Sequence, residues 1–129
     1  MRASVIAALE KAKGAKAVRL SRSSLLRIGS STVNVRTANE KAGDNYWFDV
    51  TPSFFRSVNY FLFACGSAST VYVFPAAVLE KLIANASLGG QKQVPNFTIY
   101  MDRHQLEPAG RSNERASIRS YLNNYGAIQ

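Results

Sequence analysis

Acidic residues limit the hydrolytic chemistry that this sequence can support, because it contains only eight of them. A metal-dependent phosphodiesterase needs clustered carboxylates, since hard divalent ions prefer oxygen ligands and the attacking water must be activated beside the phosphate. Asp49 is the most informative acid, because it lies inside an aromatic run where a carboxylate is paired, exposed or functional. Asp44 and Glu40 precede this run. These three acids are the candidate catalytic residues if the chain is a Mg-dependent nuclease; otherwise we expect no cofactor.

Histidine and cysteine, two further residue types that support catalysis, occur once each, whereas Ser and Thr are plentiful. His104 is the only histidine and follows a predicted strand, where it could contact a phosphate, although a surface role is more common. Cys65 is the only cysteine and lies in an apolar run, which is typical of an inert, packed thiol. We find no GxSxG, GxxxxGK or GxGxxG motif, and we predict no metal site. Common nucleotide-dependent enzymes are therefore disfavoured.

Basic residues are the most abundant chemistry-bearing type. Sixteen Lys and Arg against eight Asp and Glu give a net charge of +8, which favours a polyanionic partner such as nucleic acid. Arg115 and Arg119 are four residues apart on a predicted helix and would share one face. The candidate phosphate contacts are Arg22, Arg27, Arg36, Lys41, Arg56, Arg103, His104, Arg111, Arg115 and Arg119. The alternative is that the chain is simply soluble and cationic.

Aromatic residues in the predicted strands offer a second way to contact nucleic acid. Tyr46, Trp47, Tyr60 and Tyr72 could stack on bases, but strand aromatics usually fill cores. Only partial exposure of these rings would favour the stacking role.

The elements that must position these residues follow from apolar spacing and turn formers. Helical spacing predicts helices over residues 4–13, from Pro75 to Gly89 and over residues 112–125. Alternating or continuous apolar runs predict strands over residues 17–21, 24–31, 32–38, 46–50, 58–66, 69–75 and 97–101. Residues 58–66 and 69–75 are nearly all apolar, which is typical of strands covered on both faces at the centre of a sheet. We therefore expect a single α/β domain over residues 1–129, with a mixed central β-sheet flanked by helices.

The sequence predicts a protein of the cytoplasm. A lone cysteine excludes an internal disulfide, and the N-terminal residues lack the uninterrupted apolar run of a signal peptide. The most apolar stretch, Val58–Cys65, is far shorter than a membrane span. We expect no membrane association.

A resemblance to a known superfamily covers about residues 32–101. The order of the segments resembles that of restriction-endonuclease-like, or PD-(D/E)XK, nucleases. The matching segments are Val33–Thr37 for a strand ending in a pattern like E-x-K-T, Trp47 and Phe48 for an aromatic strand, Phe61–Cys65 for a buried strand, and Tyr72–Pro75 for a strand that leads into a proline-started helix. The resemblance implies a restriction-endonuclease-like αβ sandwich in which Asn34 and Arg36 occupy the catalytic Glu and Lys positions.

Three functions remain open at this point. The first is a nucleic-acid-binding domain, with duplex DNA as the expected ligand, whose nuclease centre has been lost, since Asn34 and Arg36 would bind a divalent metal poorly. The second is an active Mg-dependent endonuclease that uses Asp49 with Asp44 or Glu40. The third is a protein-interaction subunit, such as a homodimer, whose Tyr- and Phe-rich strands pair at an exposed edge.

Overall fold

The computed structural model describes residues 1–20, 24–39 and 43–129. Its helices are α1 (Arg2–Lys13), α2 (Phe54–Ser57) and α3 (Ala76–Leu82), with short 3-10 turns η1 (Ser112–Glu114), η2 (Arg119–Tyr121) and η3 (Tyr125–Ala127). Its strands are β1 (Val18–Arg19), β2 (Leu25–Ile28), β3 (Ser31–Ala38), β4 (Asn45–Asp49), β5 (Tyr60–Cys65), β6 (Val71–Pro75), β7 (Leu88–Gly89), β8 (Val94–Tyr100), β9 (Gln105–Pro108) and β10 (Ala116–Ser117). Within the described ranges, no helix is long and apolar enough to cross a membrane.

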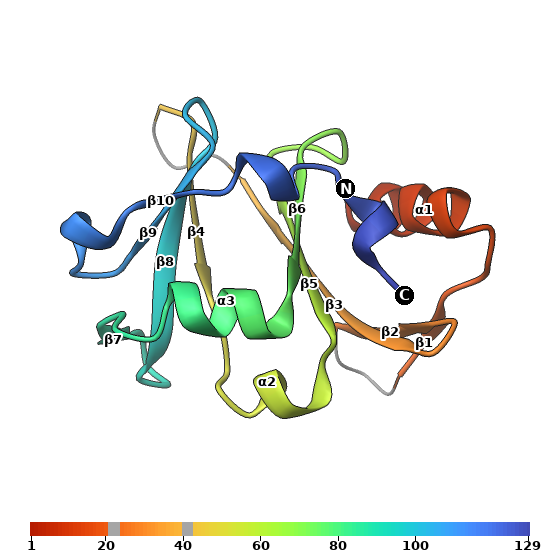
Figure 1. The fold of residues 1–129 in the computed structure, drawn as a ribbon, viewed down its shortest axis with the longest axis horizontal. Helices are drawn as coiled ribbons and strands as arrows, with labels where there is room; N and C mark the ends of the chain where they lie inside the picture. The colour runs from red at the N-terminus through yellow and green to blue at the C-terminus, as the bar shows by residue number, and fades with distance from the viewer. Residues whose placement is uncertain (21–23, 40–42) are drawn as a thin grey trace.

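The first sheet, sheet A, has the strand order β1-β2-β3-β5-β6. Strands β3 and β5 are parallel, with Val33 opposite Tyr60 and Ala38 opposite Cys65, and the other pairs are antiparallel. Between β3 and β5 the chain leaves the sheet to form β4 and α2 (Figure 1). Helix α1 and the C-terminal turn η3 lie against one face of this sheet (Figure 1).

Strands β5 and β6 are buried on both faces, which confirms the prediction from their continuous apolar runs. Phe61, Phe63 and Phe74 belong to the core between the two sheets, whereas Leu62 and Val73 belong to the core under α1. Alternate residues therefore supply two cores. Strand β6, however, forms an edge of sheet A, where we expected both runs at the centre.

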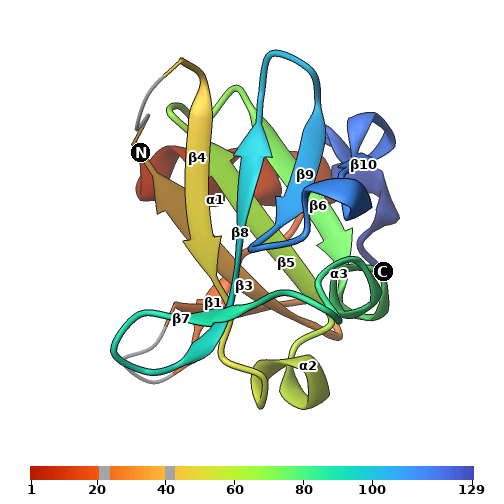
Figure 2. The same cartoon turned by 90° about the vertical axis from the view of Figure 1, so that its left-hand side faces the viewer.

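The second sheet, sheet B, is antiparallel with the order β10-β9-β8-β4, and β7 pairs with β8. Its inner face contributes Tyr46, Phe48, Phe97 and Ile99 to the core shared with sheet A and α3. In Figure 2, β4, β8 and β9 face the viewer and no helix crosses in front of them. Sheet B therefore has one uncovered face, which we call the outer face; it contains Trp47, Asp49, Asn96, Thr98, Tyr100 and Glu107.

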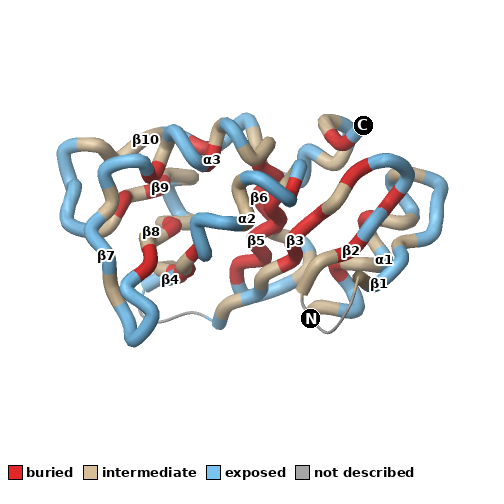
Figure 3. The backbone as a smooth tube through the Cα atoms, turned by 90° about the horizontal axis from the view of Figure 1, so that it is seen from below, coloured by how far each residue is buried: buried red, intermediate tan, exposed pale blue. Residues whose placement is uncertain are grey.

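These two sheets confirm the α/β class, but the strands are divided between two sheets where we expected one central sheet. Figure 3 shows the result, with buried residues concentrated in β3, β5 and β6 and more exposed chain around them. One reason is that β4 follows β3 directly in the chain yet pairs with β8 rather than with β3. Alternating strands carry no information about which partner they pair with, so this division was not visible in the sequence.

The predicted first helix agrees with the structure. Helix α1 spans Arg2–Lys13 and ends at Gly14, which adopts the left-handed conformation (φ 63°) and donates its N–H to the carbonyl of Glu10. Val5 and Leu9 are its buried residues. The predicted helix after Pro75 exists but is shorter, since α3 ends at Leu82.

The predicted helix over residues 112–125 is wrong. This segment forms separate 3-10 turns and the short strand β10, in which Ala116 pairs with Leu106 of β9. Asn123 has a positive φ of 51° and hydrogen-bonds with β6 through both its backbone and its side chain, accepting from the N–H of Val71 at 3.0 Å. These tertiary hydrogen bonds compete with helix formation, and apolar spacing of three and four residues also fits successive turns.

Candidate nucleic-acid interface

The two residues that the resemblance would place at catalytic positions lie on the same face of β3. Asn34 and Arg36 are two residues apart and point away from α1, because Val33 and Val35 fill the core under that helix. Asn34 is buried, and its amide donates to the hydroxyl of Ser24. This hydrogen bond satisfies a polar side chain where an acidic one would be needed for metal binding.

Arg36 connects the two sheets. Its guanidinium donates to the backbone carbonyl of Asp49 at 2.8 Å and to the carboxylate Oδ1 of the same residue at 3.0 Å. Both side chains are about one-third exposed (32% and 31%), so the pair is partly screened by water. The structure therefore brings two sequence-predicted site residues together, but as an ion pair in which Asp49 is already engaged.

The other candidate acid is distant from Asp49. Asp44 precedes β4 and Asp49 ends it, so they are five positions apart along an extended strand, which is roughly 16 Å. One divalent ion cannot bridge that distance. Among the described residues, no three His, Cys, Asp or Glu side chains form a metal-binding group. Glu40 lies outside the described residues.

Arg115 is also neutralised. Its Nη2 and Nε atoms lie 2.7 and 3.1 Å from Oε1 of Glu107, and its guanidinium stacks 4.0 Å from the centre of the Tyr100 ring. The hydrogen bond that Arg115 donates to Glu107 raises the pKa of Arg115 above its usual value. Arg119 lies on the separate turn η2 and is exposed, so the two arginines do not share a helix face as we predicted.

His104 has a structural partner. Its Nδ1 lies 2.7 Å from the hydroxyl of Tyr72, a residue with no exposed surface. Burial raises the pKa of Tyr72, so its hydroxyl stays protonated at neutral pH. Nearby, Arg103 is highly exposed and lies 3.9 Å from the carboxylate of Asp102.

Cys65 is inert, as the sequence predicts. It is buried, and burial raises the pKa of its thiol to about 12. The thiolate required of a nucleophile is therefore almost absent at neutral pH.

Two predicted phosphate contacts lie on one connected surface, which we call the cationic face. Arg27 is exposed on β2, on the side of sheet A opposite α1. It pairs across the strands with Thr32, whose N–H donates to the side chain of Asn59 at 2.8 Å, and Asn59 follows the helix α2 that carries exposed Arg56. Among the described residues, no carboxylate lies within 4 Å of either guanidinium.

The remaining predicted contacts lie elsewhere. Arg111 is exposed and donates from Nε to the carbonyl of Asn85 at 2.7 Å. The turn that carries Arg103 and the turn η2 that carries Arg119 lie at the end of the molecule opposite α2 (Figure 1). Arg22 and Lys41 lie outside the described residues. The ten predicted contacts therefore do not form a single surface.

One cation was missed by the sequence reasoning. Arg2 lies on α1, donates to the carbonyl of Val35 at 2.6 Å, and has its pKa lowered by burial and by the positive charge of Arg19. Two guanidinium groups are thus close enough to repel each other. A basic residue in the first turn of a helix, where an acid is favourable, was the available signal.

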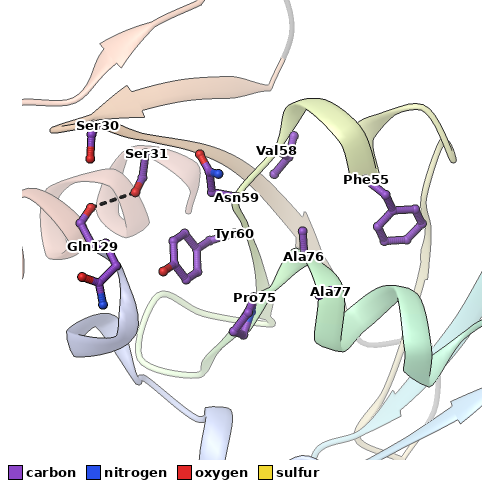
Figure 4. A pocket seen from close by; sticks show the side chains of 10 residues that line it. All are labelled: Ser30, Ser31, Phe55, Val58, Asn59, Tyr60, Pro75, Ala76, Ala77 and Gln129. Atoms are coloured by element: carbon purple, nitrogen blue, oxygen red, sulfur yellow. Dashed lines mark hydrogen bonds between the residues drawn. The ribbon is translucent and has the colours of Figure 1, made fainter.

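The exposure of the aromatic residues separates two roles. Tyr46 and Tyr72 are buried and fill the core, as strand aromatics usually do. Tyr60 is partly exposed and lines a shallow hollow of about 490 Å³ with Ser31, Asn59 and Pro75 (Figure 4). Trp47 is 37% exposed, on the outer face of sheet B. Tyr60 and Trp47 therefore both meet the condition of partial exposure that the sequence set for stacking, and Trp47 lies on the open sheet face.

Comparison with known proteins identifies no family. No protein-family model, no curated protein and no solved structure matches this chain. The resemblance to PD-(D/E)XK nucleases thus stays a prediction, and the geometry of the chain itself carries the functional argument.

Proposed function

We propose that this protein binds nucleic acid, with duplex DNA as the leading partner, through the cationic face. One observation carries the proposal: Arg27 and Arg56 are exposed on a connected surface with no described carboxylate in ion-pair range, in a chain of net charge +8. Exposed, unpaired guanidinium groups release condensed counterions when they contact phosphates. Arginines that are already paired with acids contribute less to such binding.

The size of the cationic face suits a duplex. Arg27 lies opposite Thr32, Thr32 is hydrogen-bonded to Asn59, and Asn59 follows Arg56 by three residues, so the separation of the two arginines is on the order of 15 Å. A duplex carries one negative charge per about 1.7 Å of its axis, so this length presents roughly nine charges. Two arginines can therefore contact different phosphates of one duplex.

The proposal includes no catalytic centre. Asn34 is buried against Ser24, and Asp49 accepts two hydrogen bonds from Arg36. A nuclease that used Asp49 would first have to break this pair. The active-endonuclease alternative is therefore the weaker of the two nucleic-acid functions, and its magnesium requirement gives it a direct test.

The test is binding of a labelled DNA duplex over a salt series, with and without Mg²⁺, followed by separation of the strands on a denaturing gel. We expect intact strands and an affinity that falls steeply with salt. The double variant Arg27→Gln/Arg56→Gln should lower the slope of log K against log salt by about 1.8, since each phosphate contact contributes about 0.9. The matched control is Arg103→Gln/Arg119→Gln, which removes the same charge at the opposite end of the molecule.

The alternatives have distinct outcomes. Binding that is insensitive to salt would overturn the electrostatic proposal, and a larger loss in the control variant would place the interface at the other end. Mg²⁺-dependent cleavage that Asp49→Asn abolishes would support the nuclease instead. A mass that rises with protein concentration, without nucleic-acid binding, would support the homodimeric interaction subunit.

A further inference from the structure

We propose that Trp47 is a stacking platform for an unpaired base, so that the preferred ligand is a nucleic acid with a single-stranded stretch. This inference rests on the proposed function and deepens it. The cationic face would hold the backbone, and Trp47 would hold a base. Stacking on an aromatic ring tolerates any base, because every base has a π-face.

The position of Trp47 suits this role. It is the only tryptophan of the chain, it lies on strand β4 at the edge of sheet B, and over a third of its surface (37%) is exposed. The outer face on which it lies has no helix in front of it (Figure 2). More than a third of the indole is open to solvent on this face, so a ligand can reach part of the ring.

Hydrogen bonds hold the indole ring in place. Its Nε1 donates to Oδ1 of Asn96 at 3.1 Å, and Nδ2 of Asn96 donates in turn to the carbonyl of Ser87 at 3.1 Å. Gly89 makes room for this amide, because a Cβ atom there would lie 2.7 Å from Nδ2. A ring fixed in this way loses little freedom when a base stacks on it. Asn96 is therefore a positioning residue for the platform.

The charges around Trp47 permit a polyanion to approach. The outer face contains two carboxylates next to the aromatic residues, Asp49 and Glu107, and each is bound to an arginine. Neither therefore presents an unpaired negative charge to a phosphate. This neutralisation distinguishes the outer face from an ordinary acidic or mixed surface, and the overall charge of +8 favours a nucleic acid over a neutral ligand.

The platform is continuous with the cationic face. Asp49 is two residues from Trp47 on β4, about 7 Å along the strand. Its partner Arg36 lies on β3, on the same face of sheet A as Thr32 and Arg27. A single strand that contacts Arg27 can thus pass Arg36 and reach Trp47 without crossing the core.

The experiment uses the single tryptophan as its reporter. The fluorescence of the indole is recorded while an oligo(dT) of twelve nucleotides, or a duplex of equal length, is added. The fluorescence anisotropy of the same oligonucleotides, carrying a label, measures binding independently. We expect oligo(dT) to quench the fluorescence and the duplex to quench it much less. Trp47→Ala should weaken oligo(dT) binding by about tenfold or more, in keeping with the loss of one stacked base.

Two variants serve as controls. Trp47→Phe retains a ring and should keep most of the affinity for oligo(dT). Leu88 lies on β7, which pairs with β8, and its side chain is 58% exposed. Leu88→Ala therefore removes another exposed apolar side chain and should leave oligo(dT) binding unchanged. Circular dichroism and the thermal midpoint of each variant establish that it is folded.

The outcomes separate this inference from the proposed function. If labelled oligo(dT) binds without quenching and Trp47→Ala binds as well as the wild type, the platform is wrong while nucleic-acid binding stands. If the duplex quenches as strongly as oligo(dT), the preference for an unpaired base is wrong. If neither oligonucleotide changes anisotropy at low salt, the proposed function fails and this inference fails with it.

Discussion

Strands β5 and β6 of sheet A are covered on both faces, whereas sheet B is covered on one. In β5 of sheet A, alternate residues such as Leu62 and Phe63 enter different cores, and every residue from Phe61 to Cys65 is buried. In β4 of sheet B, Phe48 enters the core while Trp47 faces outward. The alternate residues of β5 thus fill two cores, whereas the outward positions of β4 are left open to solvent.

The arginines divide in a similar way. Arg36 and Arg115 are paired with acids that lie on sheet B, whereas Arg27 and Arg56 on the cationic face have no described carboxylate within 4 Å. A net charge of +8 therefore does not locate an interface by itself. The arginines without a described carboxylate partner are the better candidates for an interface, and they can be identified only after the ion pairs are known.

The largest expected effect comes from breaking the core that joins the sheets. The ring of Phe63 lies 4.7 Å from that of Phe48 and 5.2 Å from that of Phe97, so Phe63→Ala leaves a cavity between sheets A and B. We expect it to lower the free energy of unfolding by about 3–5 kcal/mol. Trp47→Ala on the outer face should lower it by less, about 1–2 kcal/mol, because the indole is already 37% exposed in the folded protein. Urea denaturation of both variants measures this difference, and equal losses would contradict it.

Local patterns in the sequence predicted most elements but not their pairing. The run over residues 32–38 became β3, and Gly14 ended α1 as expected, because alternation and a left-handed glycine are local signals. The run over residues 112–125 failed because hydrogen bonds from Asn123 to distant β6 overrode its helical spacing. Strand β9 was missed for a related reason: QLEP contains few residues of high strand propensity, and its pairing with β8 determines its conformation.

The sequence was sufficient to predict which residues belong to the candidate site, but not which contacts these residues make. The sequence identified Asp49, Arg36, Arg27 and Trp47 as residues of interest. It could not show that Arg36 bonds to Asp49, because that contact depends on how two sheets are placed relative to each other. It also could not rank the aromatics by exposure, because neighbouring positions of a strand face opposite sides and the buried side is set by packing.

The second largest expected effect is a loss of stability at high pH, caused by Cys65 on the buried strand β5. Burial raises the pKa of Cys65 to about 12 in the folded state, against about 8.5 when unfolded. Stability from the neutral thiol is therefore complete below about pH 8.5 and is lost as the pH rises toward 12. By pH 10 the loss is about 2 kcal/mol. Thermal midpoints from pH 8 to 10.5 should fall more steeply for the wild type than for Cys65→Ala, and parallel curves would exclude this role of burial.

The smallest expected effect concerns the ion pair that links the two sheets. Because Arg36 donates to both the carbonyl and the carboxylate of Asp49, Asp49→Asn keeps the backbone bond while Arg36→Gln loses the guanidinium entirely. We therefore expect Arg36→Gln to be the more destabilising of the two, with a coupling energy between the sites of about 0.5–1 kcal/mol in a double-mutant cycle.

Salt identifies the source of that coupling. Both side chains are about one-third exposed, so 1 M salt should reduce the coupling energy while leaving the loss caused by Phe63→Ala nearly unchanged. The same Asp49→Asn protein also tests the alternative function, because a nuclease that depended on this carboxylate would lose all Mg²⁺-dependent cleavage. If the carboxylate of Asp49 mainly binds Arg36, the Asp49→Asn protein should instead bind duplex DNA with an affinity within about twofold of the wild type. Surface pairs of this kind contribute no more than about 1 kcal/mol.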